Sequence, residues 1–251
     1  MAGPVTAHAR KFGAAYLALS GIFGIAIGLF IVLVERPAPP PPLPWSAWKP
    51  QSGEQTDETQ EIADHIAAQY HLPSGHRLVR VYVGSPGSAG DPIQAVAFAT
   101  TINPTSQSQI RGFVPASQAV MYILCGAGSK CSIKEGKASI ARGAVLRREA
   151  LELALYTFKY VKGKDSVVAF FPPTPGNRIT NALFFARSDF DTELKHPLRR
   201  TLPQRVPPKT DKLSPVERRI VDQLTTPRQY RFSLKRDQSG ARVLVLAPLA
   251  G

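Results

Sequence analysis

The sequence is poor in cysteine and histidine and lacks the common nucleotide-binding and zinc-protease motifs. Only two cysteines and five histidines occur among its 251 residues. It has no G-x-x-x-x-G-K-[ST] phosphate loop, no G-x-G-x-x-G fingerprint, no H-E-x-x-H and no G-x-S-x-G. We therefore expect no cofactor and favour a non-enzymatic protein. An enzyme acting on wall glycan or lipid remains an alternative, because glycan-acting sites need no local motif.

The histidines do not form a metal-binding pattern. His65, His71 and His76 are close in sequence, with Asp64 beside the first. Their spacing matches no regular helix face, and no cysteine thiolate lies near them. The sequence therefore predicts no metal site.

The two cysteines are separated by a short, glycine-rich stretch. Cys125 and Cys131 flank the residues GAGSK. An even cysteine count outside the reducing cytosol indicates a bridge, and the glycines let the two Cα atoms approach to about 5.5 Å. The spacing is not C-x-x-C, which argues against an oxidoreductase. We expect a structural disulfide. The alternative is two free thiols, with Cys125 a candidate nucleophile beside His196.

One long apolar run lies near the N-terminus. Residues 12–34 read FGAAYLALSGIFGIAIGLFIVLV and carry no charge. At about 1.5 Å per residue, such a helix spans ~35 Å, enough to cross a hydrocarbon core of about 30 Å. The alternative is a cleaved signal peptide, whose apolar region is usually only about 7–15 residues long. We predict an uncleaved transmembrane helix over residues 12–34.

Charges at the ends of this run predict its orientation. Arg10 and Lys11 precede it, whereas Glu35 and Arg36 follow it and cancel. Positively charged flanks stay on the cytoplasmic side of a membrane. We therefore expect residues 1–11 to form a short cytoplasmic tail and the chain after residue 34 to lie outside the cell membrane.

Small residues recur at every fourth position within the run. Ser20, Gly24 and Gly28 would form one stripe on a helix, along which a second membrane helix can approach closely. Because glycine is frequent in membrane helices in general, the stripe is also compatible with a helix that has no partner.

A proline-rich segment separates the run from the rest of the chain. Residues 36–50 read RPAPPPPLPWSAWKP, a composition that favours polyproline II and a stiff spacer. We assign residues 35–50 to a linker. At ~3.1 Å per residue its prolines extend for roughly 25 Å, so we expect Trp45 and Trp48 to pack against the outer domain rather than enter the bilayer.

Residues 51–251 are predicted to form one domain. Helices are expected at residues 56–70, 143–161 and 214–224. The second of these pairs Arg148 with Glu152 at i, i+4 and is apolar over a wide arc. Strands are expected at residues 77–83, 94–102, 119–125, 166–171, 181–187, 230–235 and 242–247. Because the strands come in hairpin-like runs, we predict an α+β fold, with a mostly antiparallel sheet packed on two or three helices.

Positive charge is concentrated in the C-terminal half. Residues 131–251 carry 23 Lys and Arg against 11 Asp and Glu, and the whole chain has a net charge of +13. The densest part is residues 195–219, here called the basic segment, where prolines are expected to keep the chain extended. An extended cationic segment can lie along a polyanion, although a solvated loop is equally compatible. The candidate binding residues are Lys195, Arg199, Arg200, Arg205, Lys209 and Lys212.

These features lead to a functional expectation. We expect a single-pass membrane-anchored envelope protein whose extracytoplasmic domain binds or scaffolds. Anionic wall polymer, acidic lipid and another membrane protein are the expected partners, and nucleic acid is not expected outside the cell. Two alternatives remain open: a membrane-anchored enzyme with its site in the loops around residues 172–178, and an accessory subunit of a membrane assembly.

Overall fold

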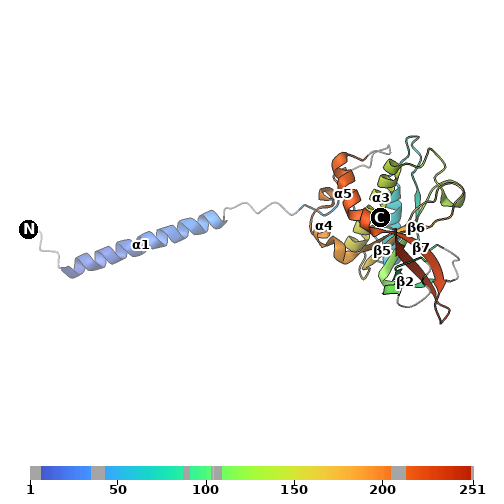
Figure 1. The fold of residues 1–251 in the computed structure, drawn as a ribbon. Coiled ribbons are helices and arrows are strands. Elements are labelled where there is room, and N and C mark those ends of the chain that lie inside the picture. Colours follow the sequence, from blue (N-terminus) through green and yellow to red (C-terminus); the bar gives the residue numbers. More distant parts are fainter. Residues whose placement is uncertain are drawn as a thin grey trace, which may run out of the picture. The chain divides into compact units, whose positions relative to one another are not determined.

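The computed structural model describes residues 7–34, 43–86, 91–102, 104, 109–204 and 213–249. The chain divides into two compact units, Met1–Leu43 and Pro44–Gly251 (Figure 1). The second unit begins at Pro44 rather than at residue 51, because Trp45 and Trp48 pack against the core of the domain.

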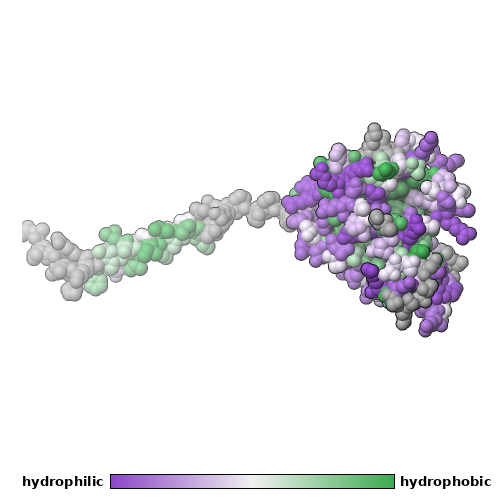
Figure 2. Space-filling model, in the orientation of Figure 1, coloured by the Kyte–Doolittle hydropathy of each residue, from purple (hydrophilic) through white to green (hydrophobic). Residues whose placement is uncertain are grey.

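The first unit contains one long apolar helix, α1 (Ala7–Val34). Within it, Phe12–Ile31 is long and apolar enough to cross a membrane, and its side chains are exposed in the structure. Figure 2 shows the described part of α1 as predominantly hydrophobic. The predicted N-terminal apolar helix is therefore confirmed by length and composition.

The second unit is built on one sheet of eight strands. Along the sheet their order is β1-β4-β5-β6-β7-β8-β2-β3. The pairs β4/β5 and β2/β8 are parallel and the other neighbours are antiparallel, so the predicted mostly antiparallel sheet is confirmed. The strands are β1 (Arg80–Val83), β2 (Ile93–Ala99), β3 (Ile110–Pro115), β4 (Ala119–Cys125), β5 (Ser166–Phe170), β6 (Asn181–Ala186), β7 (Gln229–Arg236) and β8 (Arg242–Pro248).

Three helices form a layer over one face of the sheet: α2 (Gln55–Ala67), α3 (Ile140–Tyr160) and α5 (Pro215–Thr225). The one-turn helix α4 (Asp191–Lys195) lies near the end of α3. Nearly every residue of α3 from Ala144 to Phe158 is buried, as its wide apolar arc predicts. Alternate residues of β4, β5 and β6 face this layer and form the main core with it.

The sheet is strongly curved, so that strands which are not neighbours approach each other on its other face. Phe98 on β2 packs edge-on against Phe184 on β6, with ring centroids 4.7 Å apart, although β7 and β8 lie between these strands in the sheet. In a flat sheet, strands three positions apart would be separated by about 14 Å. The curvature therefore creates a second apolar core without a second layer of helices.

Two local differences from the predicted elements have clear causes. The first strand begins at Arg80 rather than at residue 77, because Leu78 N donates to Tyr70 O and Leu72 N to His76 O, which closes a tight turn. Strand β3 was not predicted, since Gly112 and Pro115 within it are residues that strands usually exclude.

Candidate functional site

The end of the linker is fastened to the domain by Trp45. The Trp45 indole donates through Nε1 to Glu193 O at 3.2 Å, and Leu198 N donates to Trp45 O at 2.7 Å. Its ring packs edge-on against Tyr156 and Tyr160, at 5.4 and 5.7 Å between centroids. We call residues 44–50 the linker junction. The expected packing of Trp45 against the domain is observed.

Trp48 completes the linker junction. Its ring stacks on His65 with centroids 3.9 Å apart and planes 6° apart, and partial burial of His65 lowers the pKa of its imidazole. Ser46 Oγ donates to Trp48 O at 2.5 Å and lies 2.6 Å from the Tyr160 hydroxyl. These contacts explain why the compact unit includes residues 44–50.

Ser46 also begins an S-x-x-K sequence that ends at Lys49, a spacing found in some serine acyltransferases. Here the segment is not helical, Lys49 is exposed, and the serine hydroxyl is engaged by Trp48 and Tyr160. The geometry gives Ser46 a role in fixing the linker junction rather than one as a nucleophile.

The first part of the basic segment lies beside the linker junction. Lys195, Arg199 and Arg200 are exposed and flank Leu198, whose backbone N–H binds Trp45. The neighbouring Lys159 donates to Leu194 O at 3.0 Å and lies 5.7 Å from the Trp45 ring. The structure therefore brings three of the six candidate cations together. Arg205, Lys209 and Lys212 lie outside the described residues.

The described part of the basic segment is not extended, contrary to expectation. Residues Leu198–Arg200 form a 3₁₀ turn, and Leu202 is buried in the core. Arg148 Nη2 also donates to Gln204 O at 2.7 Å. Burial of Leu202 and this hydrogen bond hold the chain against α3, which outweighs the preference of the nearby prolines for extended backbone.

Beneath this region lies a buried ionic cluster that the sequence revealed only in part. The predicted Arg148–Glu152 pair is present at 2.9 Å, and Arg148 also binds Glu217 of α5 at 2.9 Å and the Tyr70 hydroxyl. Arg148 is 1% exposed and Glu217 0%. Such a closed cluster ties α3 to α5 and has no surface at which to meet a ligand.

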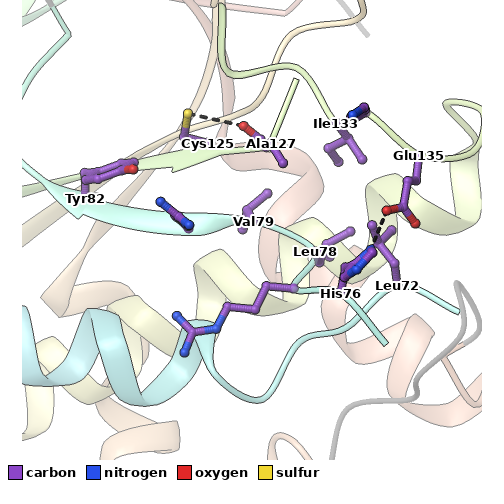
Figure 3. Close-up of a pocket in the computed structure, with 13 residues that line it drawn as sticks. Leu72, His76, Leu78, Val79, Tyr82, Cys125, Ala127, Ile133 and Glu135 are labelled. Atoms are coloured by element: carbon purple, nitrogen blue, oxygen red, sulfur yellow. Dashed lines mark hydrogen bonds and ion pairs between the residues drawn. The ribbon is translucent and has the colours of Figure 1, made fainter. Parts of the chain in front are cut away.

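A crevice lies beside the two cysteines, at the other end of α3 from the linker junction. Residues 72–82 form one wall and residues 125–135 the other, enclosing about 540 Å³ (Figure 3). Cys125 and Cys131 are at disulfide distance, with their sulfurs 2.08 Å apart, so the predicted pairing is reproduced. Gly126 allows the close turn, because a Cβ there would lie 2.4 Å from Ser132 O.

The rim of the crevice is mostly cationic. Arg77, Arg80 and Lys134 are exposed, and neither arginine has an acidic partner among the described residues. The carboxylate of the lining, Glu135, accepts from Ser74 Oγ and contacts His76 Nδ1, both at 2.5 Å. Figure 3 shows Glu135 and His76 facing each other at one end. The hydrogen bonds from Ser74 and His76 hold the pKa of Glu135 below its ordinary value.

A second cavity, of about 350 Å³, lies at the loop around residues 172–178, where an enzyme would have its site. Residues 172–175 line it together with the start of α3. Its lining includes no carboxylate or imidazole, and the Ser139 hydroxyl is engaged as the N-cap of α3, accepting from Arg142 N at 3.1 Å. This arrangement offers no general base next to the serine.

The remaining candidate feature is the stripe of small residues on α1. In α1, Ser20 Oγ donates to Tyr16 O at 2.6 Å, and a Cβ added at Gly24 or Gly28 would meet no atom within 4 Å. Within the described part of α1 the space beside Gly24 and Gly28 is therefore open, and helix association stays a prediction. Among the described residues, no group of three or more His, Cys, Asp or Glu side chains could hold a metal ion.

Comparison with known proteins adds no family to these observations. No family model, curated protein or solved structure matches the chain.

Proposed function

We propose that this protein is a single-pass membrane protein whose outer domain binds a phosphate-bearing polyanion close to the membrane. The apolar helix α1 supplies the anchor, and Arg10 and Lys11 favour a cytoplasmic N-terminus. The Cys125–Cys131 pair is consistent with a domain in an oxidising compartment. The domain then acts as a tethered binding module.

The attachment of Trp45 beside the basic segment is the observation that carries this proposal. It fixes Lys195, Arg199 and Arg200 next to the place where the chain arrives from the anchor. The linker residues before Pro44 can extend over about 28 Å. At full extension the linker holds these cations farther from the bilayer than the ~10 Å screening length at 0.1 M. A phosphate-bearing wall polymer is therefore favoured over lipid headgroups, which come within reach only when the linker is bent.

Co-sedimentation of the fragment 44–251 tests this proposal. One arm uses vesicles containing phosphatidylglycerol, and the other uses isolated cell wall. The fragment includes the linker junction, because Trp45 and Trp48 belong to the compact unit. Replacing Lys195, Arg199 and Arg200 by Glu should weaken binding by several kcal/mol, at about 1 kcal/mol or more per cation near an anionic surface.

A matched variant controls for net charge. Arg111, Arg231 and Lys235 are also exposed, and replacing them by Glu changes the total charge equally. This control variant should retain most of the binding. A salt concentration of 1 M should abolish the binding of the parent and of the control variant, since the screening length falls from ~10 Å at 0.1 M to ~3 Å at 1 M. If the first variant binds both materials as well as the parent does, the basic segment is a solvated loop and the proposal fails.

A further inference from the structure

The crevice and the linker junction lie at opposite ends of the same helix. Trp45 packs on Tyr156 and Tyr160 in the last turns of α3. The crevice wall is tied to the first turn of α3, because Arg142 Nη1 donates to Glu135 O at 2.8 Å. A helix of 21 residues separates these ends by about 30 Å. The crevice is therefore a second surface, remote from the cations of the basic segment.

The crevice combines an apolar floor with positive charges that lie apart from one another on its walls. Leu72, Leu78 and Ile133 are buried side chains that line the floor. Arg77 and Arg80 come from one wall and Lys134 from the other. Glu135 is engaged by Ser74 and His76 and also interacts with the charge of Lys134, which leaves Arg77 and Arg80 without a carboxylate partner among the described residues of the crevice. A ligand that places carboxylates between apolar groups would satisfy both features.

We infer that the crevice binds a short acidic and apolar peptide segment of a partner protein. A volume of about 540 Å³ lies within the range of ligand sites, roughly 300–1,000 Å³. The apolar side chains of the segment cover Leu72, Leu78 and Ile133. Its carboxylates pair with Arg77, Arg80 and Lys134, and the arginines can bind them in bidentate fashion. This inference is independent of the polyanion contact at the linker junction.

Fluorescence anisotropy with the full-length protein in phosphatidylcholine nanodiscs tests the inference. The probe is a labelled hexapeptide of alternating Leu and Asp, compared with peptides in which Ser or Lys replaces Asp. The acidic peptide should bind at least about tenfold more tightly than either comparison peptide. Arg77→Glu and Arg80→Glu should each weaken its binding about tenfold, whereas Arg77→Lys should retain part of it.

Two controls separate this site from other anion binding. A variant with Arg231→Glu and Lys235→Glu and the basic-segment variant of Lys195, Arg199 and Arg200 should bind the peptide as the parent does. Equal weakening in these variants would mean nonspecific attraction and overturn the inference. Equal affinity for all three peptides, unchanged binding by Arg80→Glu, or displacement of the peptide by an equal concentration of inorganic phosphate would also overturn it. The thermal melt of each variant establishes that the domain is folded.

Discussion

Glu149 occupies the most unusual environment of any single side chain described. It is 0% exposed, and neither carboxyl oxygen has a hydrogen-bond partner among the described residues. Burial, and then the charge of Glu152, raises the pKa of this carboxyl well above 4.5, while Arg148 opposes the shift. Burial therefore favours the neutral acid over the carboxylate. This state has a cost at neutral pH, because the unfolded chain would release the proton.

Replacing Glu149 by Gln should stabilise the domain at neutral pH. The raised folded pKa gives a contribution to stability that is fully present below about pH 4.5 and is lost as pH rises towards the folded pKa. Gln stays neutral, so its advantage should grow by about 1.4 kcal/mol per pH unit above that point. Urea unfolding between about pH 5 and pH 8 measures the difference. The exposed Glu54→Gln is the control for the chemical change from carboxyl to amide. A parallel profile for Glu149→Gln and the parent would contradict the raised pKa of Glu149.

Glu217 shows how a residue can be predicted correctly in one respect and not in another. Ser214 and Glu217 have the S-x-x-E spacing of a capping box, and Glu217 N does donate to Ser214 Oγ at 3.2 Å. Its side chain does not return to the cap but binds Arg148 on α3. A capping box is a local pattern, whereas the choice of Arg148 depends on how two distant helices pack, which local spacing does not encode.

At the scale of elements, the disulfide loop can be tested directly. Cys125 and Cys131 should resist alkylation in unreduced, denatured protein, as judged by mass spectrometry. Replacing both by Ser should lower the free energy of unfolding by roughly 2–2.5 kcal/mol, the chain-entropy value for so small a loop. If both cysteines are labelled without reduction, the pair is not bonded and Cys125 returns as a candidate nucleophile.

Elements with strong local patterns could be predicted, and those defined by distant partners could not. Strand β4 spans the predicted residues 119–125, and β7 and β8 form the predicted hairpin, because alternation and turn residues specify both. Strand β3 depends on pairing with β2 in spite of Gly112 and Pro115. The crevice could not be predicted, because neither of the two segments that form it carries a motif. The charge of the basic segment could be read from its composition, but its position beside Trp45 could not.

At the scale of the whole chain, the proposed topology can be measured. Arg10 and Lys11 precede the apolar span, and the following flank is neutral overall. A reporter active only in the cytoplasm, fused after Gly251, should be inactive, while one that needs export should be active. Replacing Arg10 and Lys11 by Glu should reduce the difference in activity between the two reporters. Strong cytoplasmic activity of the unmodified fusion would reverse the orientation and remove the support that the disulfide now gives to an outer domain.

The fastening of Trp45 also has a mechanical consequence. Suppose that a stretching force acts between the anchor and a ligand held in the crevice. It would be applied to the domain at two points: at Trp45, and at the segment that Arg142 holds through Glu135. Between these points the load passes along α3, which is buried over most of its length. Tension would therefore bear on helix packing, on a few hydrogen bonds and, through Arg80 and Cys125 in the crevice walls, on the ladder between β1 and β4.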